Sequence, residues 1–207
     1  MYISIGSDCV TKTRIEEMKY NKEKQESNLF DWVLSDLESV NYILKSGVKG
    51  DTFNIKNWEV LTKTIDDKWA VKNKYCYFIS LHDASSSLTY NEAFHIVSDK
   101  FIRRLQRFYE KIVTEENIHF IGVFDKSNPI HTGKNTITTD TLTEFINIVK
   151  QYRASKPFTV TVIVEDTCNI DAGVLPNYVK VIDSNAHYVK DWYRFFLNWN
   201  DIMSNVP

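Results

Sequence analysis

Residues 90–124 have the sequence YNEAFHIVSDKFIRRLQRFYEKIVTEENIHFIGVF, in which a long helical pattern runs directly into a strand-like one. Apolar side chains recur every three or four residues up to Thr114, and this spacing predicts a helix over 90–114. The run at 118–124 is rich in aromatic and aliphatic residues and predicts a buried strand. A helix followed by a buried strand is the building unit of an α/β fold.

The same alternation of strand and helix continues on both sides of this stretch. Further strands are predicted at 2–5, 75–81, 158–164 and 179–182, and further helices at 9–18, from Leu37 to a stop at Gly47, from a cap at Thr139 or Asp140 to Val149, and at 188–203. This order predicts a single α/β domain over 1–207, with a mostly parallel sheet covered by helices on both faces in a Rossmann-like three-layer arrangement. Residues 50–74 fit neither pattern and are predicted to be a small irregular insertion, made either of short strands or of a loop-rich lobe.

Composition narrows the function classes. The net charge of −2 argues against nucleic acid as a partner. The three cysteines, Cys9, Cys76 and Cys168, lack the spacing of a disulfide framework or a zinc site, which indicates a reducing compartment. The sequence shows neither a signal peptide nor a membrane-spanning run. We therefore expect a cytoplasmic protein, or an intracellular part of a larger multidomain enzyme, with no cofactor and no metal.

The first strand is followed by Gly6, Ser7, Asp8 and Cys9, which we expect to form the working edge of the sheet. Ligands of parallel sheets bind beyond the carboxyl ends of the strands. Gly6 permits a tight turn, and the helix start behind it suits a phosphate or a thiolate. A plain β–α turn with a capping aspartate explains the same residues equally well.

The candidate catalytic residues are Asp8, Cys9, Asp31, His82 and Asp83. A thiol at a helix N-terminus has a lowered pKa, so Cys9 is a candidate nucleophile, although an inert buried cysteine is the commoner case. If the strand before His82 belongs to the parallel sheet, His82 reaches the same edge as a general base oriented by Asp83. A solvent-facing histidine beside a capping aspartate is the alternative.

The candidate substrate-binding residues are Gly6, Ser7, Trp32, Arg103, Arg104 and Arg107. Arg103 and Arg107 lie one helical turn apart, where they could hold a phosphate or a carboxylate, although such groups are more often a solvated face. Asp31 lies in an apolar patch beside Trp32. A buried Asp31 needs hydrogen-bond donors, and it is either structural or catalytic.

Several short motifs together resemble a known family. They are the segments 4–9, 30–32, 82–83, 101–108 and 191–192. In this order they are similar to a domain family of unknown function, labelled a "putative papain-like cysteine peptidase", that occurs in bacteria and large DNA viruses, often near surface-glycan genes. The resemblance implies Cys9 as nucleophile and His82 as base, and a viral member would act in the host cytoplasm. Leu29 and Gly122 depart from the family pattern, which has proline and arginine there.

Three functions remain open from the sequence. The alternation of strands and helices and the glycan context favour a metal-independent glycosyltransferase that binds a nucleotide sugar and a surface-glycan acceptor. In that hypothesis, Asp8, Asp31, Asp83 or His82 deprotonates the acceptor, and the arginines stabilise the leaving diphosphate. The alternatives are a papain-like cysteine hydrolase that uses Cys9 and His82, and a non-catalytic glycan-binding module.

Overall fold

The computed structural model describes residues 1–6, 11, 15, 27–47, 50–124, 137–164 and 169–184, and within this part the chain forms two four-stranded sheets. The parallel sheet has the order β1 (Tyr2–Ser4), β6 (Ile118–Phe124), β7 (Phe158–Val164) and β8 (Val179–Asp183). The antiparallel sheet has the order β2 (Val33–Ser35), β5 (Phe78–Ser85), β4 (Lys68–Asn73) and β3 (Trp58–Lys63). The α/β class is confirmed. The antiparallel sheet was not predicted from the sequence.

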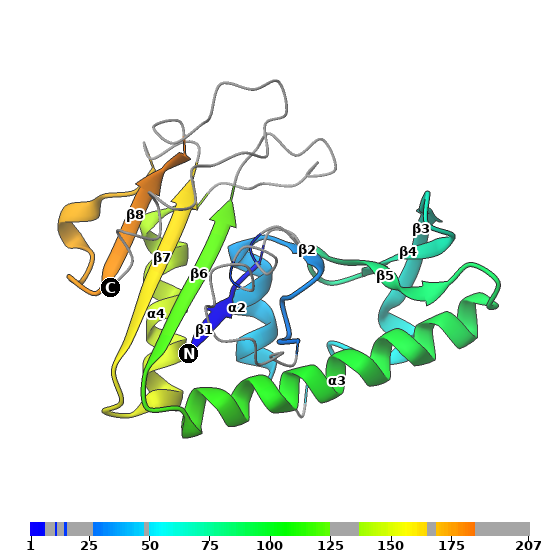
Figure 1. The fold of residues 1–207 in the computed structure, drawn as a ribbon, viewed down its shortest axis with the longest axis horizontal. Coiled ribbons are helices and arrows are strands. Elements are labelled where there is room, and N and C mark those ends of the chain that lie inside the picture. The colour runs from blue at the N-terminus through cyan, green and yellow to red at the C-terminus, as the bar shows by residue number, and fades with distance from the viewer. Residues whose placement is uncertain are drawn as a thin grey trace.

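Three α-helices connect and cover these sheets: α2 (Leu37–Ser46), α3 (Tyr90–Thr114) and α4 (Thr139–Arg153). Side chains of Asp36, Thr89 and Thr138 cap their N-termini, and Thr89 forms a reciprocal capping box with Glu92. In Figure 1, α4 lies behind the parallel strands, and α3 runs along the lower edge of the molecule, from the antiparallel sheet to the parallel one. Short 3₁₀ turns occur at η1 (Ile55–Asn57) and η2 (Ala172–Val174).

Alternation along β6 divides the two faces of the parallel sheet. Phe120 and Phe124 point into the main core, which α2, α3 and α4 complete. Ile121 and Val123 point to the opposite face, where they form a smaller cluster that includes Ile15. Thr11 and Ile15 are helical, in agreement with the helix predicted over 9–18, whose other residues lie outside the described part. The complete three-layer arrangement therefore stays a prediction.

Residues 50–74 form short strands, one of the two predicted alternatives, and are more regular than an irregular insertion. They contain η1 and the β3–β4 hairpin, whose turn places Asp67 in the left-handed region at φ 54°. Register shifts interrupt the pairing of β4 with both of its neighbours, and most β3 side chains are exposed or half-buried. The short, interrupted alternation concealed the hairpin in the sequence.

An aromatic cluster holds the antiparallel sheet against α3. Phe78 of β5 meets Phe101 of α3 edge to face, with 4.8 Å between ring centroids. Phe53 stacks on Trp58 at 5.9 Å. All four rings are at most 2 % exposed, so much of the aromatic content is core and does not line a groove.

The backbone at Gly6 brings the two sheets into contact. Gly6 has a φ of 85°, and a Cβ atom there would lie 2.8 Å from Ser35 Oγ and 3.3 Å from the Ser35 carbonyl oxygen. The amide N–H of Ile5 donates to the carbonyl oxygen of Ile121 at 2.9 Å, so pairing with β6 continues until the residue before Gly6. Glycine is required at position 6 because the chain passes directly over the last residue of β2.

Arg153 connects the end of α3 to the turn between α4 and β7. Its side chain is 1 % exposed and donates hydrogen bonds to five backbone carbonyl oxygens. The acceptors belong to Ile112, Glu115, Glu116, Lys156 and Pro157. One guanidinium therefore satisfies the carbonyls around the end of α3 and the α4–β7 turn, for which the helices have no internal partners.

We predict that Arg153→Met lowers the free energy of unfolding by about 3 kcal/mol, because it leaves several buried carbonyls without a donor. Urea unfolding followed by circular dichroism measures this change. Gln151→Met, at an exposed position in the same helical turn, is the control and should stay within about 0.5 kcal/mol of the wild type. Equal stability of the two variants would contradict the role of Arg153.

We predict that Gly6→Ala destabilises the protein by about 2–3 kcal/mol, through the strained φ and the contact with Ser35. Ser35 Oγ is buried and has no hydrogen-bond partner among the described residues, so Ser35→Ala alone should be close to neutral. The double variant should recover about 1 kcal/mol, because it removes the nearest atom. Additive effects in this thermal or urea cycle would show that the contact does not limit position 6.

Candidate functional site

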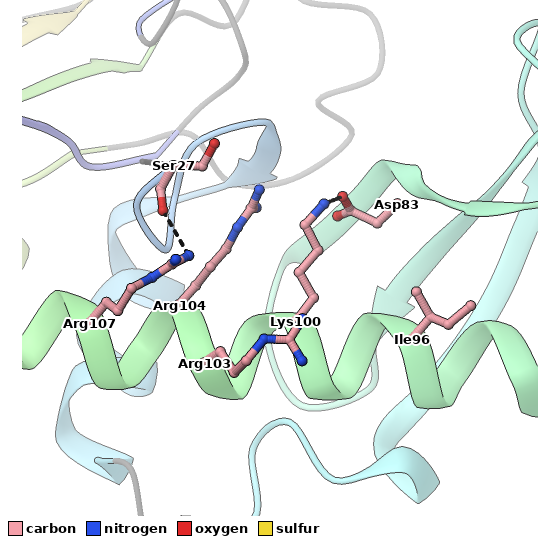
Figure 2. Close-up of a pocket in the computed structure, with 7 residues that line it drawn as sticks. All are labelled: Ser27, Asp83, Ile96, Lys100, Arg103, Arg104 and Arg107. Carbon is pink, nitrogen blue, oxygen red and sulfur yellow. Dashed lines mark hydrogen bonds and ion pairs between the residues drawn. The ribbon is translucent and has the colours of Figure 1, made fainter. Parts of the chain in front are cut away.

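A strongly charged cleft lies on α3. It has a volume of about 510 Å³. Figure 2 shows its basic side chains on α3 and Asp83 above them on β5. The lining residues are Ser27, Asp83, Ile96, Lys100, Arg103, Arg104 and Arg107. We call this surface the basic cleft.

Helical spacing explains why the four cations gather. Lys100, Arg103, Arg104 and Arg107 occupy positions i, i+3, i+4 and i+7 of one helix, so they share one face over about 10 Å. The sequence indicated that Arg103 and Arg107 share a face, and the structure places all three predicted arginines in one cleft. We did not predict Lys100 from the sequence, although its four-residue spacing from Arg104 places it on the same face of the helix.

Arg104 is the buried member of this group. Its side chain is 5 % exposed, and its guanidinium lies 5.3 Å from the centre of the Phe101 ring. Nη1 donates to the carbonyl oxygen of Asp31 at 3.2 Å. Burial lowers the pKa of Arg104, and the carboxylates of Asp83 and Asp31 partly offset this effect. The cleft therefore holds a cation in a partly desolvated position.

Asp31 is a buried turn residue. It is completely buried, and its Oδ2 accepts a hydrogen bond from the Asn28 amide at 2.7 Å. Lys111 and Arg107 of α3 donate to Asn28 Oδ1 and to the Ser27 carbonyl oxygen, respectively. These bonds attach residues 27–31 to α3, which accounts for a structural role of Asp31.

Trp32 ends this turn in an unusual backbone conformation. Its φ is 67°, in the left-handed region that bulky side chains rarely adopt, and its side chain is half-buried. The next residue begins β2. Such strain persists only where surrounding contacts fix the backbone, and it is found more often near functional sites than elsewhere.

His82 and Asp83 do not follow a parallel strand, contrary to our prediction. Both lie within β5, which pairs antiparallel with β2 and β4. Asp83 accepts hydrogen bonds from Lys100 and, at 2.5 Å, from Ser80 Oγ. The His82 side chain is 45 % exposed, and its Nδ1 lies 4.0 Å from a carboxylate oxygen of Asp66. Asp83 therefore belongs to the basic cleft, and the carboxylate near His82 is that of Asp66.

The first loop contributes only Gly6 to the described structure. Ser7, Asp8 and Cys9 lie outside the described residues, as does Cys168. Cys76 is described: burial, with a smaller effect from Asp36, raises the pKa of its thiol to about 12. Cys76 is therefore protonated and inert near neutral pH.

A second cleft, of about 370 Å³, lies beside α2 and η1. Its rim carries the exposed rings of Tyr42 and Tyr75. Its polar groups largely bond to one another: Lys56 pairs with Asp51 at 3.1 Å, and Asn57 donates to the Asp51 carbonyl oxygen at 2.5 Å. This cleft has less unused polar capacity than the basic cleft.

Two further searches concern the described part of the chain. No group of three or more His, Cys, Asp or Glu side chains is placed there to hold a metal ion. No helix there combines the length and the apolar character that crossing a membrane requires.

Comparison with known proteins identifies the family. The model of a family described as "Putative papain-like cysteine peptidase (DUF1796)" matches residues 1–168. No curated protein and no solved structure matches the chain. Our main prediction, a glycosyltransferase that uses a nucleotide sugar, is therefore wrong in its reaction class, and the cysteine hydrolase alternative agrees with the match. Because the match covers most of the 207 residues, the chain belongs to this papain-like cysteine peptidase family.

Proposed function

We propose that the protein is a cysteine-dependent peptidase in which Cys9 is the nucleophile and His82 the general base. The observation that carries this proposal is the family match, which extends over residues 1–168 and so includes both residues. A cytoplasmic location, proposed from the sequence, suits a free catalytic thiol because the cytosol keeps cysteines reduced.

The surroundings of Gly6 support a reactive position for Cys9. Gly6 follows β1, so the chain leaves the parallel sheet there at its carboxyl edge. Cys9 comes three residues later, and Thr11, two positions further on, is helical. A thiol close to a helix N-terminus has a lowered pKa, because the unpaired N–H groups stabilise the thiolate.

The register of the antiparallel sheet relates His82 to this edge. Ser35, which Gly6 contacts, pairs with Phe78, and His82 lies four residues further along β5. Four strand residues cover at most about 13 Å. Three residues after Gly6 span at most about 10 Å, so the proposal requires the chain after Gly6 to turn toward β5.

The proposed reaction proceeds through an acyl-enzyme. The Cys9 thiolate attacks the peptide carbonyl carbon while His82 holds the thiol proton. The C–N bond breaks, the leaving amine takes that proton, and a thioester to Cys9 remains. Water then attacks the thioester, gives one proton to His82 and releases a carboxylic acid, and the thiol is restored. A carboxylate oxygen of Asp66 lies 4.0 Å from His82 Nδ1, on the side from which it can orient the ring.

We predict that iodoacetamide near pH 7 alkylates Cys9 and leaves Cys76 unmodified, because the raised pKa of Cys76 keeps its thiol protonated. Peptide mapping by mass spectrometry distinguishes the three cysteines. Cys9→Ser should abolish cleavage of a fluorogenic peptide library, whereas Cys76→Ser, the control, should retain it. An unlabelled Cys9 together with full activity of Cys9→Ser would exclude the thiol as nucleophile.

We predict that His82→Gln lowers kcat by at least about a hundredfold with little change in KM, since a general base acts in the chemical step. Asp66→Asn should lower kcat by less, about tenfold, because Asp66 only orients the ring of His82. His95→Gln, an exposed histidine on α3, is the control. Steady-state kinetics on the best library peptide measure all three, and unchanged kcat in His82→Gln would assign the base to another residue.

A further inference from the structure

We propose that the basic cleft binds an acidic peptide segment that carries two carboxylates close together. This binding site goes beyond the proposed peptidase chemistry, since it requires neither Cys9 nor His82. The argument rests on the charges that line the cleft, on their spacing along α3 and on what the cleft lacks.

The first step concerns charge. Among the described lining residues, four cationic side chains face one carboxylate, that of Asp83, although the whole chain has a net charge of −2. Asp83 is already engaged by Lys100 and Ser80. The positive charge is therefore concentrated on one face of α3 and is only partly neutralised.

The second step concerns unused donors. A guanidinium has five N–H donors, and Arg104 uses one of them in a hydrogen bond to the carbonyl oxygen of Asp31. Arg103 is exposed and forms no ion pair with any described residue. A buried cation lies next to an exposed one, and both face an open cleft. Both can therefore donate charge-assisted hydrogen bonds to an anion bound there.

The third step concerns spacing. The four cations extend over about 10 Å of helix. Side chains at positions i and i+2 of an extended peptide lie on the same side, about 7 Å apart, so two such carboxylates fit along the row. A single inorganic anion would contact only part of it. Planar carboxylates also match the donor geometry of arginine.

The fourth step concerns the apolar end of the cleft. Ile96, which lies one turn before Lys100, is 43 % exposed and offers a contact to an apolar side chain next to the acidic ones. None of the described lining residues is aromatic, so these residues offer a nucleobase or sugar ring no stacking surface. These features favour a peptide over a nucleotide.

The binding test uses fluorescence anisotropy and the full-length Cys9→Ser protein, so that cleavage cannot remove the probe. The probe is a labelled hexapeptide with two glutamates separated by one residue and a leucine on one side. Its twin has glutamines in their place and should bind at least about tenfold more weakly, because charge-assisted hydrogen bonds are lost. Raising the salt concentration from 0.05 to 0.5 M should lower the affinity for the acidic peptide by about fivefold or more.

Two variants connect the signal to the cleft. Arg103→Gln should weaken binding about tenfold, and Arg103→Glu should weaken it further, without changing the melting temperature, since Arg103 is exposed. Lys63→Gln removes one positive charge from β3, outside the cleft. This control variant should bind the acidic peptide with the same affinity as the Cys9→Ser protein. Equal binding of the glutamate and glutamine peptides, or no effect of Arg103→Glu, would overturn the proposal.

A competition arm separates the peptide from a phosphorylated ligand. Inorganic pyrophosphate should displace the acidic peptide only at far higher concentration, because it covers less of the cationic row. Tight pyrophosphate binding without binding of the acidic peptide would overturn the peptide assignment. Loss of peptidase activity in Cys9→Ser has no bearing on this result, so the two proposals fail separately.

Discussion

The packing of α3 across both sheets is the constraint on which the rest of the structure depends. Its 25 residues form a rod of about 37 Å. Phe101 packs into the aromatic cluster of the antiparallel sheet, and Phe108 contacts Phe120 of the parallel sheet. One continuous apolar stripe thus joins two sheets that otherwise meet closely at Gly6 and Ser35. The basic cleft lies on the adjoining face of the same helix, with Arg104 at the border of the apolar stripe, so core packing fixes the position of the charges.

Local patterns predicted the elements whose periodicity is long and uninterrupted. The helix over 90–114 and the strands over 118–124 and 158–164 match the observed bounds of α3, β6 and β7, because each buries a regular face. The β3–β4 hairpin was missed because register shifts and exposed side chains weaken its alternation. The strand near 75–81 was found, but its antiparallel direction depends on β2 and β4, which sequence spacing does not show.

The candidate site was predictable to the extent that it lies on one helix. The shared face of Arg103 and Arg107 follows from helical geometry. The burial of Arg104 does not, since it depends on a turn 73 residues away that presents the Asp31 carbonyl oxygen. The separation of His82 from Asp83 arises because β5 extends through both residues, and successive side chains of a strand point to opposite faces. The glycosyltransferase prediction was wrong for a different reason: the alternation of strands and helices specifies an architecture, and one architecture hosts many chemistries.

The buried carboxylate of Asp83 makes the two ends of the basic row unequal. It lies against Lys100 in the cleft wall, with 3 % of its side chain exposed. An anion near Lys100 is repelled by it, whereas an anion near Arg103, which forms no ion pair with any described residue, is more strongly attracted. The cleft therefore has an electrostatic polarity along the axis of α3. A peptide with its acidic residues near one end would therefore bind in one preferred direction along α3.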